Sequence, residues 1–267
     1  MKYKLFVSDF DGTLGIAPDI IEEQTVNAIR KYIAQGGKFV ICTGRMFSSI
    51  KLICQKYKLD GIVISYQGAS IDDLTMGKRI LEGGIDYQLA AKVAKELLED
   101  GMPACVDVED VMYCETESEY TDFHKEFAPV YKIDSIVDLV LKKQKPVMKV
   151  VTAGEPDRIY ELTQKYAKRY NGQLIINNGS NRLLEVIDPR YSKGSSVKYL
   201  SKYYNIPFDQ IISVGDSTND IELLNGDWHG VAVGDAREEL KKVAKEITVP
   251  FKEQPIKFLL EKYCLDT

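Results

Sequence analysis

Two aspartates one residue apart follow an apolar stretch near the start of the chain. The segment KLFVSDFDGTLG carries Asp9 and Asp11 soon after the apolar residues 5–7. Carboxylates this close together disfavour each other's ionised form unless a cation or a shared proton lies between them. The spacing therefore indicates metal binding or proton transfer at the end of a buried strand.

Other polar residues follow apolar runs later in the chain. Ligands of open α/β sheets bind beyond the carboxyl ends of the strands, so side chains that follow neighbouring strands meet at one edge. We therefore expect these residues to lie with Asp9 and Asp11. They are Thr43, Gly44 and Arg45 after the run at 38–42, Asp216, Asn219 and Asp220 after the run at 210–214, and Lys193 at the start of a predicted helix.

These residue types favour an oxygen-ligated cation beside a phosphate group. Carboxylate and carbonyl oxygens are the ligands that Mg²⁺ takes in proteins, usually with several waters retained. A lysine, a threonine hydroxyl and backbone amides beside glycines are donors that suit an anion with several oxygens, such as phosphate. Together with a further aspartate, they indicate phosphoryl transfer through an aspartyl-phosphate.

The elements that position these residues alternate between strand and helix in the first and last thirds of the chain. Continuous apolar strands between amphipathic helices are typical of a doubly wound, Rossmann-like α/β fold with a parallel sheet. The predicted strands are 4–8, 38–42, 61–65, 210–216, 230–235 and 246–249. The predicted helices are 46–57 and 20–35, the latter with Val26, Ile29 and Ile33 at helical spacing.

The middle third has the pattern of an α+β unit with a mostly antiparallel sheet. Gly83-Gly84 and Asp188-Pro189 are turn signals at its two ends. We therefore predict a catalytic core of residues 1–82 and 189–267 with an inserted α+β cap domain at 83–188. Within the cap, the predicted helices are 86–100, 118–127 and 155–170, and the predicted strands are 103–108, 111–115, 146–152, 173–177 and 182–187.

The composition argues against several classes of protein. The 267 residues are 45% hydrophobic with a net charge of −5, which permits a sizeable core and gives little support for nucleic-acid binding. No apolar run approaches the roughly 20 residues of a membrane helix, and the first residues do not read as a signal peptide. Two histidines exclude a histidine-rich zinc site, and five scattered cysteines favour reduced thiols. We expect a cytoplasmic monomer or homodimer, with neither nucleic acid nor membrane as its partner.

Four motifs in order make the chain similar to the haloacid dehalogenase (HAD) superfamily of phosphohydrolases. They are DFDGT at 9–13, Thr43 within TGR, Lys193 at a helix start and GDSTND at 215–220. The position of the insertion and the TGR triplet resemble the Cof-type branch. The resemblance covers the core motif by motif and the cap by pattern, and it implies a Mg²⁺-dependent phosphatase of sugar phosphates or related small metabolites.

The resemblance implies roles for the motif residues. Asp9 attacks phosphorus, and Asp11 protonates the leaving alcohol and then takes a proton from the hydrolytic water. The implied Mg²⁺ ligands are the carboxylates of Asp9 and Asp216 and the backbone carbonyl of Asp11. Asp220 orients Lys193 or a metal-bound water. The implied phosphate-binding groups are the Phe10 and Gly44 amides and the side chains of Thr43, Lys193 and Asn219.

Contacts with the remainder of the substrate are predicted at Arg45, Gln67, Asn178 and Arg182. Arg45 has the alternative of a surface charge at a helix start, and the cap residues Asn177, Asn178 and Arg182 have the alternative of simply forming a turn. The chain departs from the usual Cof-type pattern at Gln67, where an asparagine is usual, and at Asp235, where an amide is usual.

The cap segment 105–126 holds eight acidic residues and one lysine. This pattern indicates a solvated acidic face or, near an entrance, a surface that disfavours polyanionic substrates. The helical spacing of Tyr120, Phe123 and Phe127 predicts that they belong to the cap core.

Two other functions use the same residues. A phosphomutase or other phosphotransferase would share the nucleophile and replace water with a sugar bisphosphate. A non-catalytic phosphate-sensing protein, similar to a response-regulator receiver, would also cluster aspartates around Mg²⁺. Receivers, however, are much shorter and lack both an inserted cap and GDSTND.

Overall fold

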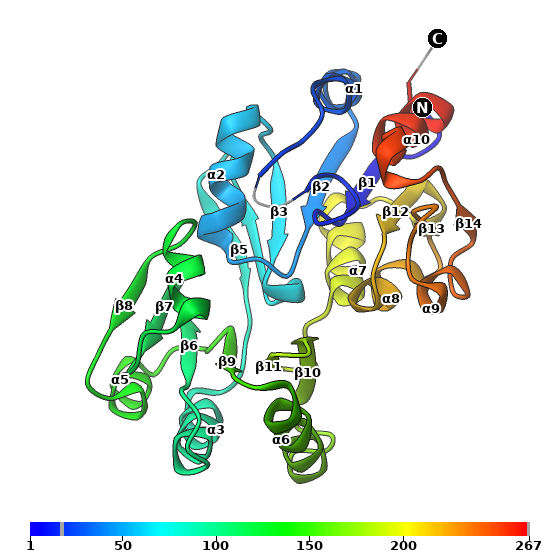
Figure 1. Cartoon of the computed structure of the whole chain (residues 1–267). Helices are drawn as coiled ribbons and strands as arrows, with labels where there is room; N and C mark the ends of the chain where they lie inside the picture. The colour runs from blue at the N-terminus through cyan, green and yellow to red at the C-terminus, as the bar shows by residue number, and fades with distance from the viewer. Residues whose placement is uncertain (17–18, 266–267) are drawn as a thin grey trace. The chain divides into compact units, whose positions relative to one another are not determined.

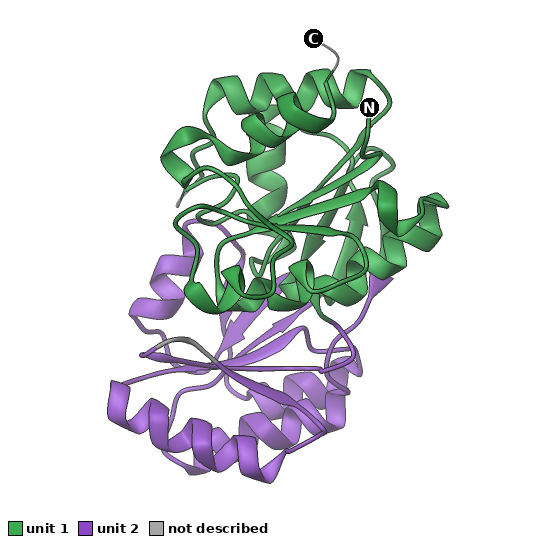
Figure 2. Cartoon of the chain, turned by 90° about the vertical axis from the view of Figure 1, so that its right-hand side faces the viewer, with its two compact units in different colours: residues 1–80, 192–267 green, residues 81–191 purple. Residues whose placement is uncertain are grey.

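The chain forms two compact units in the computed structural model (Figure 2). One unit contains residues 1–80 and 192–267, and the other contains residues 81–191. The structure describes residues 1–16 and 19–265, with only the backbone described at 178–180. In this described part, no helix has the combination of length and apolar character required to cross a membrane.

The first unit is built on an eight-stranded sheet with strand order β14-β13-β12-β1-β2-β3-β4-β5. The strands from β14 to β3 are parallel, and β4 pairs antiparallel with β3. This confirms the predicted parallel core. The strands are β1 (Leu5–Ser8), β2 (Lys38–Cys42), β3 (Ile62–Ser65), β4 (Ser70–Asp73), β5 (Lys78–Glu82), β12 (Ile211–Gly215), β13 (His229–Ala232) and β14 (Glu246–Ile247).

Helices flank this sheet in the order expected for strand–helix alternation (Figure 1). Helix α1 packs against α10, and α7 packs against α8. The predicted face of α1 is partly wrong, because Val26 and Ile29 are buried whereas Ile33 is 36% exposed. The helices are α1 (Glu23–Ala34), α2 (Phe47–Tyr57), α7 (Lys193–Tyr204), α8 (Ile221–Leu224), α9 (Glu238–Lys241) and α10 (Pro255–Tyr263).

The second unit contains a six-stranded sheet with strand order β10-β11-β9-β6-β7-β8. Its strand pairs are antiparallel except β7 with β8. The α+β pattern predicted for this region is therefore correct. The strands are β6 (Cys105–Val108), β7 (Val111–Cys114), β8 (Val130–Lys132), β9 (Lys149–Ala153), β10 (Ile175–Ser180) and β11 (Leu183–Ile187).

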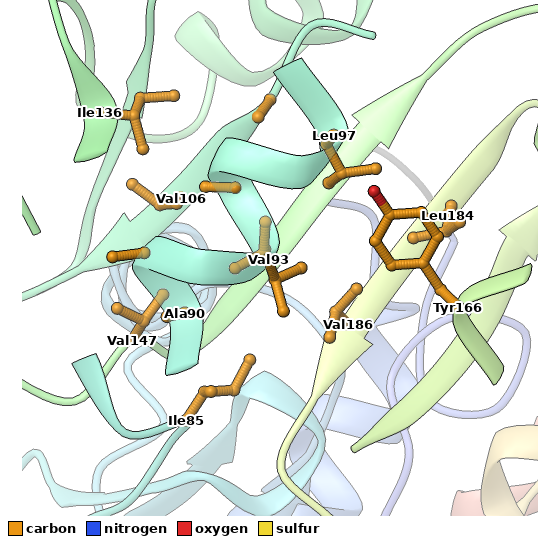
Figure 3. Packing of buried hydrophobic residues seen from close by; sticks show 14 of the residues in the cluster. Ile85, Ala90, Val93, Leu97, Val106, Ile136, Val147, Tyr166, Leu184 and Val186 are labelled. Carbon is orange, nitrogen blue, oxygen red and sulfur yellow. The ribbon is translucent and has the colours of Figure 1, made fainter. Parts of the chain in front are cut away.

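Three of the four helices of this unit cover one face of its sheet. The helices are α3 (Tyr87–Glu99), α4 (Glu119–Lys125), α5 (Ile136–Lys143) and α6 (Pro156–Arg169). Residues from α3, α5 and α6 share one apolar cluster with strand residues such as Val106, Leu184 and Val186 (Figure 3). Side chains alternate along a strand, so the residues between these valines and leucines lie on the opposite face.

Several predictions for the second unit are wrong in detail. Strand β10 continues through residues 177 and 178, so the expected turn begins only after Ser180. The prediction that Phe123 belongs to the cap core is wrong, because its side chain is 57% exposed, and Thr121 is the residue of α4 that is fully buried. The sequence reasoning also missed β8 and α5. Segments this short carry too few turns or alternations for a clear periodic signal.

Candidate active site

Three strand ends bring predicted site residues to one edge of the first unit's sheet. Strand β1 lies between β2 and β12 and is parallel to both. Asp9 follows β1, Thr43 follows β2 and Asp216 follows β12. Because parallel strands end at the same edge, the three residues share the carboxyl edge of the sheet.

Lys193 links two of the aspartates. It is the first residue of α7, whose start is fixed by a capping box between Ser192 and Ser195. The Nζ atom donates to Asp9 Oδ1 and to Asp220 Oδ1, at 2.6 Å each. The Lys193 side chain is 1% exposed, so this charged group is held away from solvent.

The buried charges shift one another's pKa values. Burial alone would lower the pKa of Lys193, but the Asp220 and Asp9 carboxylates outweigh it and raise that pKa. Burial and the nearby Asp220 raise the pKa of Asp9 well above its ordinary value, despite the opposing effect of Lys193. Burial and Asp220 also raise the pKa of Asp216 to about 6. A further cation would relieve this excess of negative charge.

The three carboxylates have the spacing of a cation site. Asp9, Asp216 and Asp220 each offer an oxygen within 4.8 Å of the others. Both oxygens of Asp220 already accept hydrogen bonds, Oδ1 from Lys193 and Oδ2 from the backbone N–H groups of Asp216 and Ser217 at 3.1 Å each. Asp9 and Asp216 are therefore the carboxylates better placed to bind a divalent ion, and Asp220 is placed to orient Lys193 and the 216–217 backbone.

The turn after β1 lies close to Asp216. Gly12 has φ +81°, a conformation that glycine adopts without strain, and an added Cβ would lie 2.7 Å from Asp216 Oδ2. The Thr13 hydroxyl donates to Asp216 Oδ1 at 3.1 Å. Thr13 was not among the individual residues predicted for the site, although its place at the end of DFDGT was the available signal.

Asp11 is held by Arg45. The arginine Nε and Nη2 donate to the two carboxylate oxygens of Asp11 at 2.8 and 2.6 Å. The Arg45 guanidinium also lies over the ring of Phe10, at 4.7 Å from its centre, and that ring is fully buried. The Asp11 carboxyl, which the sequence reasoning left free to carry a proton, is therefore engaged in an ion pair.

Gln67 joins two other motifs. Tyr66 and Gln67 have φ angles of 51° and 58°, a left-handed conformation that is uncommon for residues other than glycine. The Gln67 N–H donates to the Thr43 carbonyl at 3.1 Å, and Asn219 donates to Gln67 Oε1 at 3.4 Å. A Cβ added to Gly44 would lie 2.4 Å from Gln67 Nε2. Gln67, Gly44 and Asn219 are thus brought together.

The remaining predicted residues lie elsewhere. In the second unit, Arg182 is in the turn after β10 and forms an exposed ion pair with Glu155 at 2.6 Å. The side chain of Asn178 lies outside the described residues. In the first unit, Asp235 accepts the Phe251 N–H at 3.0 Å, so this departure from the Cof-type pattern makes a local backbone contact.

Comparison with known proteins gives a family match over nearly the whole chain. The model of the haloacid dehalogenase-like hydrolase family matches residues 6–259. A putative phosphatase of Haemophilus influenzae is 24% identical over 264 residues, which cover 98% of each chain.

Solved structures share the fold. TM0651 from Thermotoga maritima has a TM-score of 0.88 at 24% identity, over 99% of this chain and 98% of its own. BT4131, described as a HAD subclass IIB sugar phosphatase, has a TM-score of 0.79 at 21% identity, over 97% of this chain and 98% of its own.

Proposed function

We propose that this chain hydrolyses small phosphate monoesters through a phosphate ester of Asp9, with Mg²⁺ as cofactor. The chain belongs to the haloacid dehalogenase-like hydrolases and is a phosphatase. The observation that carries the proposal is the buried Lys193, which contacts Asp9 and Asp220 at 2.6 Å beside the end of the central strand. A buried ammonium group at the start of a helix is well suited to bind phosphoryl oxygens close to an attacking carboxylate.

The chain's own residues account for the two chemical steps. An oxygen of Asp9 forms a bond to phosphorus as the bond from phosphorus to the substrate oxygen breaks, and Asp11 gives its proton to that departing oxygen. In the second step, Asp11 takes a proton from water, whose oxygen attacks phosphorus and releases the Asp9 carboxylate and inorganic phosphate. Lys193 and the Thr43 hydroxyl hold the phosphoryl oxygens in both steps.

The Arg45 contact adds a condition to the role of Asp11. The bidentate ion pair fixes the direction of the carboxyl group. One of its oxygens must leave the guanidinium before it can donate a proton to the substrate. Arg45 is therefore placed to exchange Asp11 for a substrate group, which keeps it a candidate substrate contact.

The donor set fits a divalent cation with oxygen ligands. The carboxylates of Asp9 and Asp216, which can approach one ion, would hold Mg²⁺. The resemblance to the family adds the backbone carbonyl of Asp11 as a third ligand. When bound, the ion neutralises part of the charge that the carboxylates and the phosphate bring together.

Sugar phosphates or related metabolites are the proposed substrates. The fold is shared with a protein described as a sugar phosphatase, which supports this class. We assign recognition of the leaving group to the second unit, residues 81–191, and contacts near the phosphate to Gln67 and Asn219.

The test is Asp9→Asn, assayed with p-nitrophenyl phosphate and Mg²⁺. We expect turnover to fall by at least about a thousandfold, because the amide is a poor nucleophile. Near wild-type turnover would exclude Asp9 as the nucleophile. Removal of divalent ions with EDTA should abolish activity, and Mg²⁺ should restore it.

A further inference from the structure

Two cysteines face each other across a hairpin of the second unit. Strands β6 and β7 pair antiparallel, and Cys105 lies directly opposite Cys114 in the register. The strands are joined by a two-residue turn, Glu109-Asp110, whose φ angles of 53° and 62° are those of a type I′ hairpin turn. Directly opposed residues of an antiparallel pair extend their side chains from the same face of the sheet, so the two thiols are neighbours.

The backbone hydrogen bonds show which kind of cross-strand pair this is. The Cys114 carbonyl accepts the Ile133 N–H at 2.9 Å, and the Met112 N–H donates to the Pro129 carbonyl at 3.0 Å. The backbone groups of Cys114 therefore point towards β8, and Cys105 and Cys114 form a pair without hydrogen bonds between them. The Cα atoms of such a pair lie about 4.5 Å apart, within the range of roughly 4.4–6.8 Å that a disulfide spans. A disulfide between them needs little movement of the backbone.

Both thiols are free in this structure and are shielded from solvent. Cys105 is 5% exposed and Cys114 is fully buried. The Cys114 thiol donates to the Tyr131 carbonyl of β8 at 3.8 Å, and Cys105 interacts electrostatically with Tyr120 of α4. Burial, and then the neighbouring Cys114, raise the pKa of Cys105 to about 12, and burial also raises the pKa of Cys114. Neither group is therefore a reactive thiolate while α4 and β8 stay in place.

The segments beside the two thiols are of a kind that opens locally. Helix α4 has seven residues, and Thr121 is the buried one. Strand β8 has three residues, none of them buried, and lies at the edge of the sheet. Short segments with few buried residues open at a low cost in free energy. Such an opening gives an oxidant access to both thiols.

We propose that Cys105 and Cys114 form a reversible cross-strand disulfide by exchange with a low-molecular-weight disulfide such as oxidised glutathione. In the first step, one cysteine thiolate bonds to a glutathione sulfur, the bond between the two glutathione sulfurs breaks, and the released thiolate takes up the proton. In the second step, the other cysteine bonds to the protein sulfur of this mixed disulfide and the second glutathione leaves in the same way. Two protein thiols are oxidised, and one glutathione disulfide is reduced to two thiols.

The experiment maps the thiols of the full-length protein. The protein is incubated with oxidised glutathione at about pH 8, alkylated in denaturant and digested with trypsin. Both cysteines lie in one tryptic peptide, residues 96–125, whose first lysine or arginine is Lys125 at its end. We expect this peptide to become lighter by two hydrogens and to carry no alkyl group, while the protein loses two of its five free thiols.

Reduction and heating give two further readouts on the same sample. Dithiothreitol should restore both alkylation sites, because the bond is reversible. The disulfide closes a short loop of the unfolded chain, so the oxidised protein should unfold at a Tm about 3–8 °C higher than the reduced protein. These readouts do not depend on phosphatase activity, so this inference and the proposed function can fail separately.

Variants assign the bond to the pair. Cys105→Ser and Cys114→Ser should each abolish the internal disulfide and the rise in Tm. Cys54→Ser is the matched control, because it removes a buried thiol of the first unit and should leave both responses intact. If a variant does not fold, the peptide mass of the wild-type protein still decides. Five alkylated cysteines after oxidation, or glutathione on Cys105 and Cys114 without the bond between them, would overturn the inference.

Discussion

In the described part of the chain, each unit buries one lysine beside two acidic residues. Lys193 is hydrogen-bonded to both of its neighbours, and we call that cluster complete, whereas Lys149 is hydrogen-bonded to only one, and we call that cluster incomplete. Lys193 contacts Asp9 and Asp220 at 2.6 Å each. Lys149 lies 3.1 Å from Glu185 and 3.9 Å from Asp107. The carboxylates beside Lys193 both accept hydrogen bonds from it, whereas the buried carboxyl group of Asp107 beside Lys149 has no hydrogen-bond partner among the residues that the structure describes.

The difference shows two ways of accommodating buried charge. Groups that must act on a phosphoryl centre benefit from fixed positions, because no reorganisation is then needed during the reaction. A buried carboxyl group without a donor can instead stay neutral by keeping its proton, and burial favours this state for Asp107. Mutations in the two clusters should therefore affect different properties.

The largest effect is expected from Lys193→Met. Removing the ammonium group leaves Asp9 and Asp220 buried together without their shared cation, and loss of one partner of a buried pair typically costs about 3–5 kcal/mol. We expect that loss in the free energy of unfolding, measured by urea denaturation, with activity reduced by about a thousandfold or more. Unchanged stability would contradict the burial of this pair.

Asp220→Asn should have a smaller effect on folding and a clear effect on turnover. The amide oxygen can still accept the backbone N–H groups of residues 216 and 217, but the charge opposite Lys193 is lost. We expect kcat to fall by about 10–100-fold, as for residues that orient a catalytic group. Steady-state kinetics with p-nitrophenyl phosphate measures this, and an unchanged kcat would show that Lys193 is held without Asp220.

The sequence predicts the complete cluster better than the incomplete one. Asp9 follows one apolar strand, Asp220 lies in the turn after another, and Lys193 opens a helix, so the order of the elements brings them to one edge of the sheet. The Asp11–Arg45 contact depends on rotamers of side chains 34 residues apart, which no local pattern encodes.

Asp107 illustrates the limit of pattern reasoning in the second unit. The segment VDV lies in a predicted strand, which the structure confirms, and both of its valines belong to the apolar cluster. The surrounding acidic run predicted a solvated face, which is wrong for Asp107 because that side chain is 1% exposed. Alternation identifies the face of a side chain, but it does not show whether another segment, such as the helix α4 that carries Tyr120, covers that face.

The pH dependence of stability should separate the clusters further. Burial raises the pKa of Asp107 to about 7, against the opposing effect of Lys149, with smaller raising effects from Glu185 and Asp110. The folded chain therefore keeps this proton over a pH range in which the unfolded chain loses it. Protonated Asp107 therefore favours the folded state fully below about pH 4, and this contribution to the free energy of unfolding is lost as the pH rises towards 7.

Asp107→Asn removes this titration. The free energy of unfolding of the variant, compared with that of the wild-type protein at the same pH, should therefore increase from pH 5 to pH 8, by roughly 2–3 kcal/mol over this range. Tyr120 and His124 of α4 also interact with the charges of this cluster, so the variant and the wild type are compared at each pH to cancel their own titrations. A difference in Tm that does not vary with pH would contradict the buried, protonated state of Asp107.

Lys149→Met makes the same substitution in the incomplete cluster as Lys193→Met makes in the complete one. Glu185 is partly exposed and can turn towards water, while Asp107 can stay neutral by keeping its proton, so neither carboxylate must remain buried and charged. We expect a loss of about 1–2 kcal/mol at pH 6, smaller than for Lys193→Met, with turnover of p-nitrophenyl phosphate unchanged within about twofold. Parallel urea titrations of the two variants at pH 6 measure this difference. Equal losses would show that the two lysines are held by the same kind of pairing, and the distinction between a complete and an incomplete cluster would then fail.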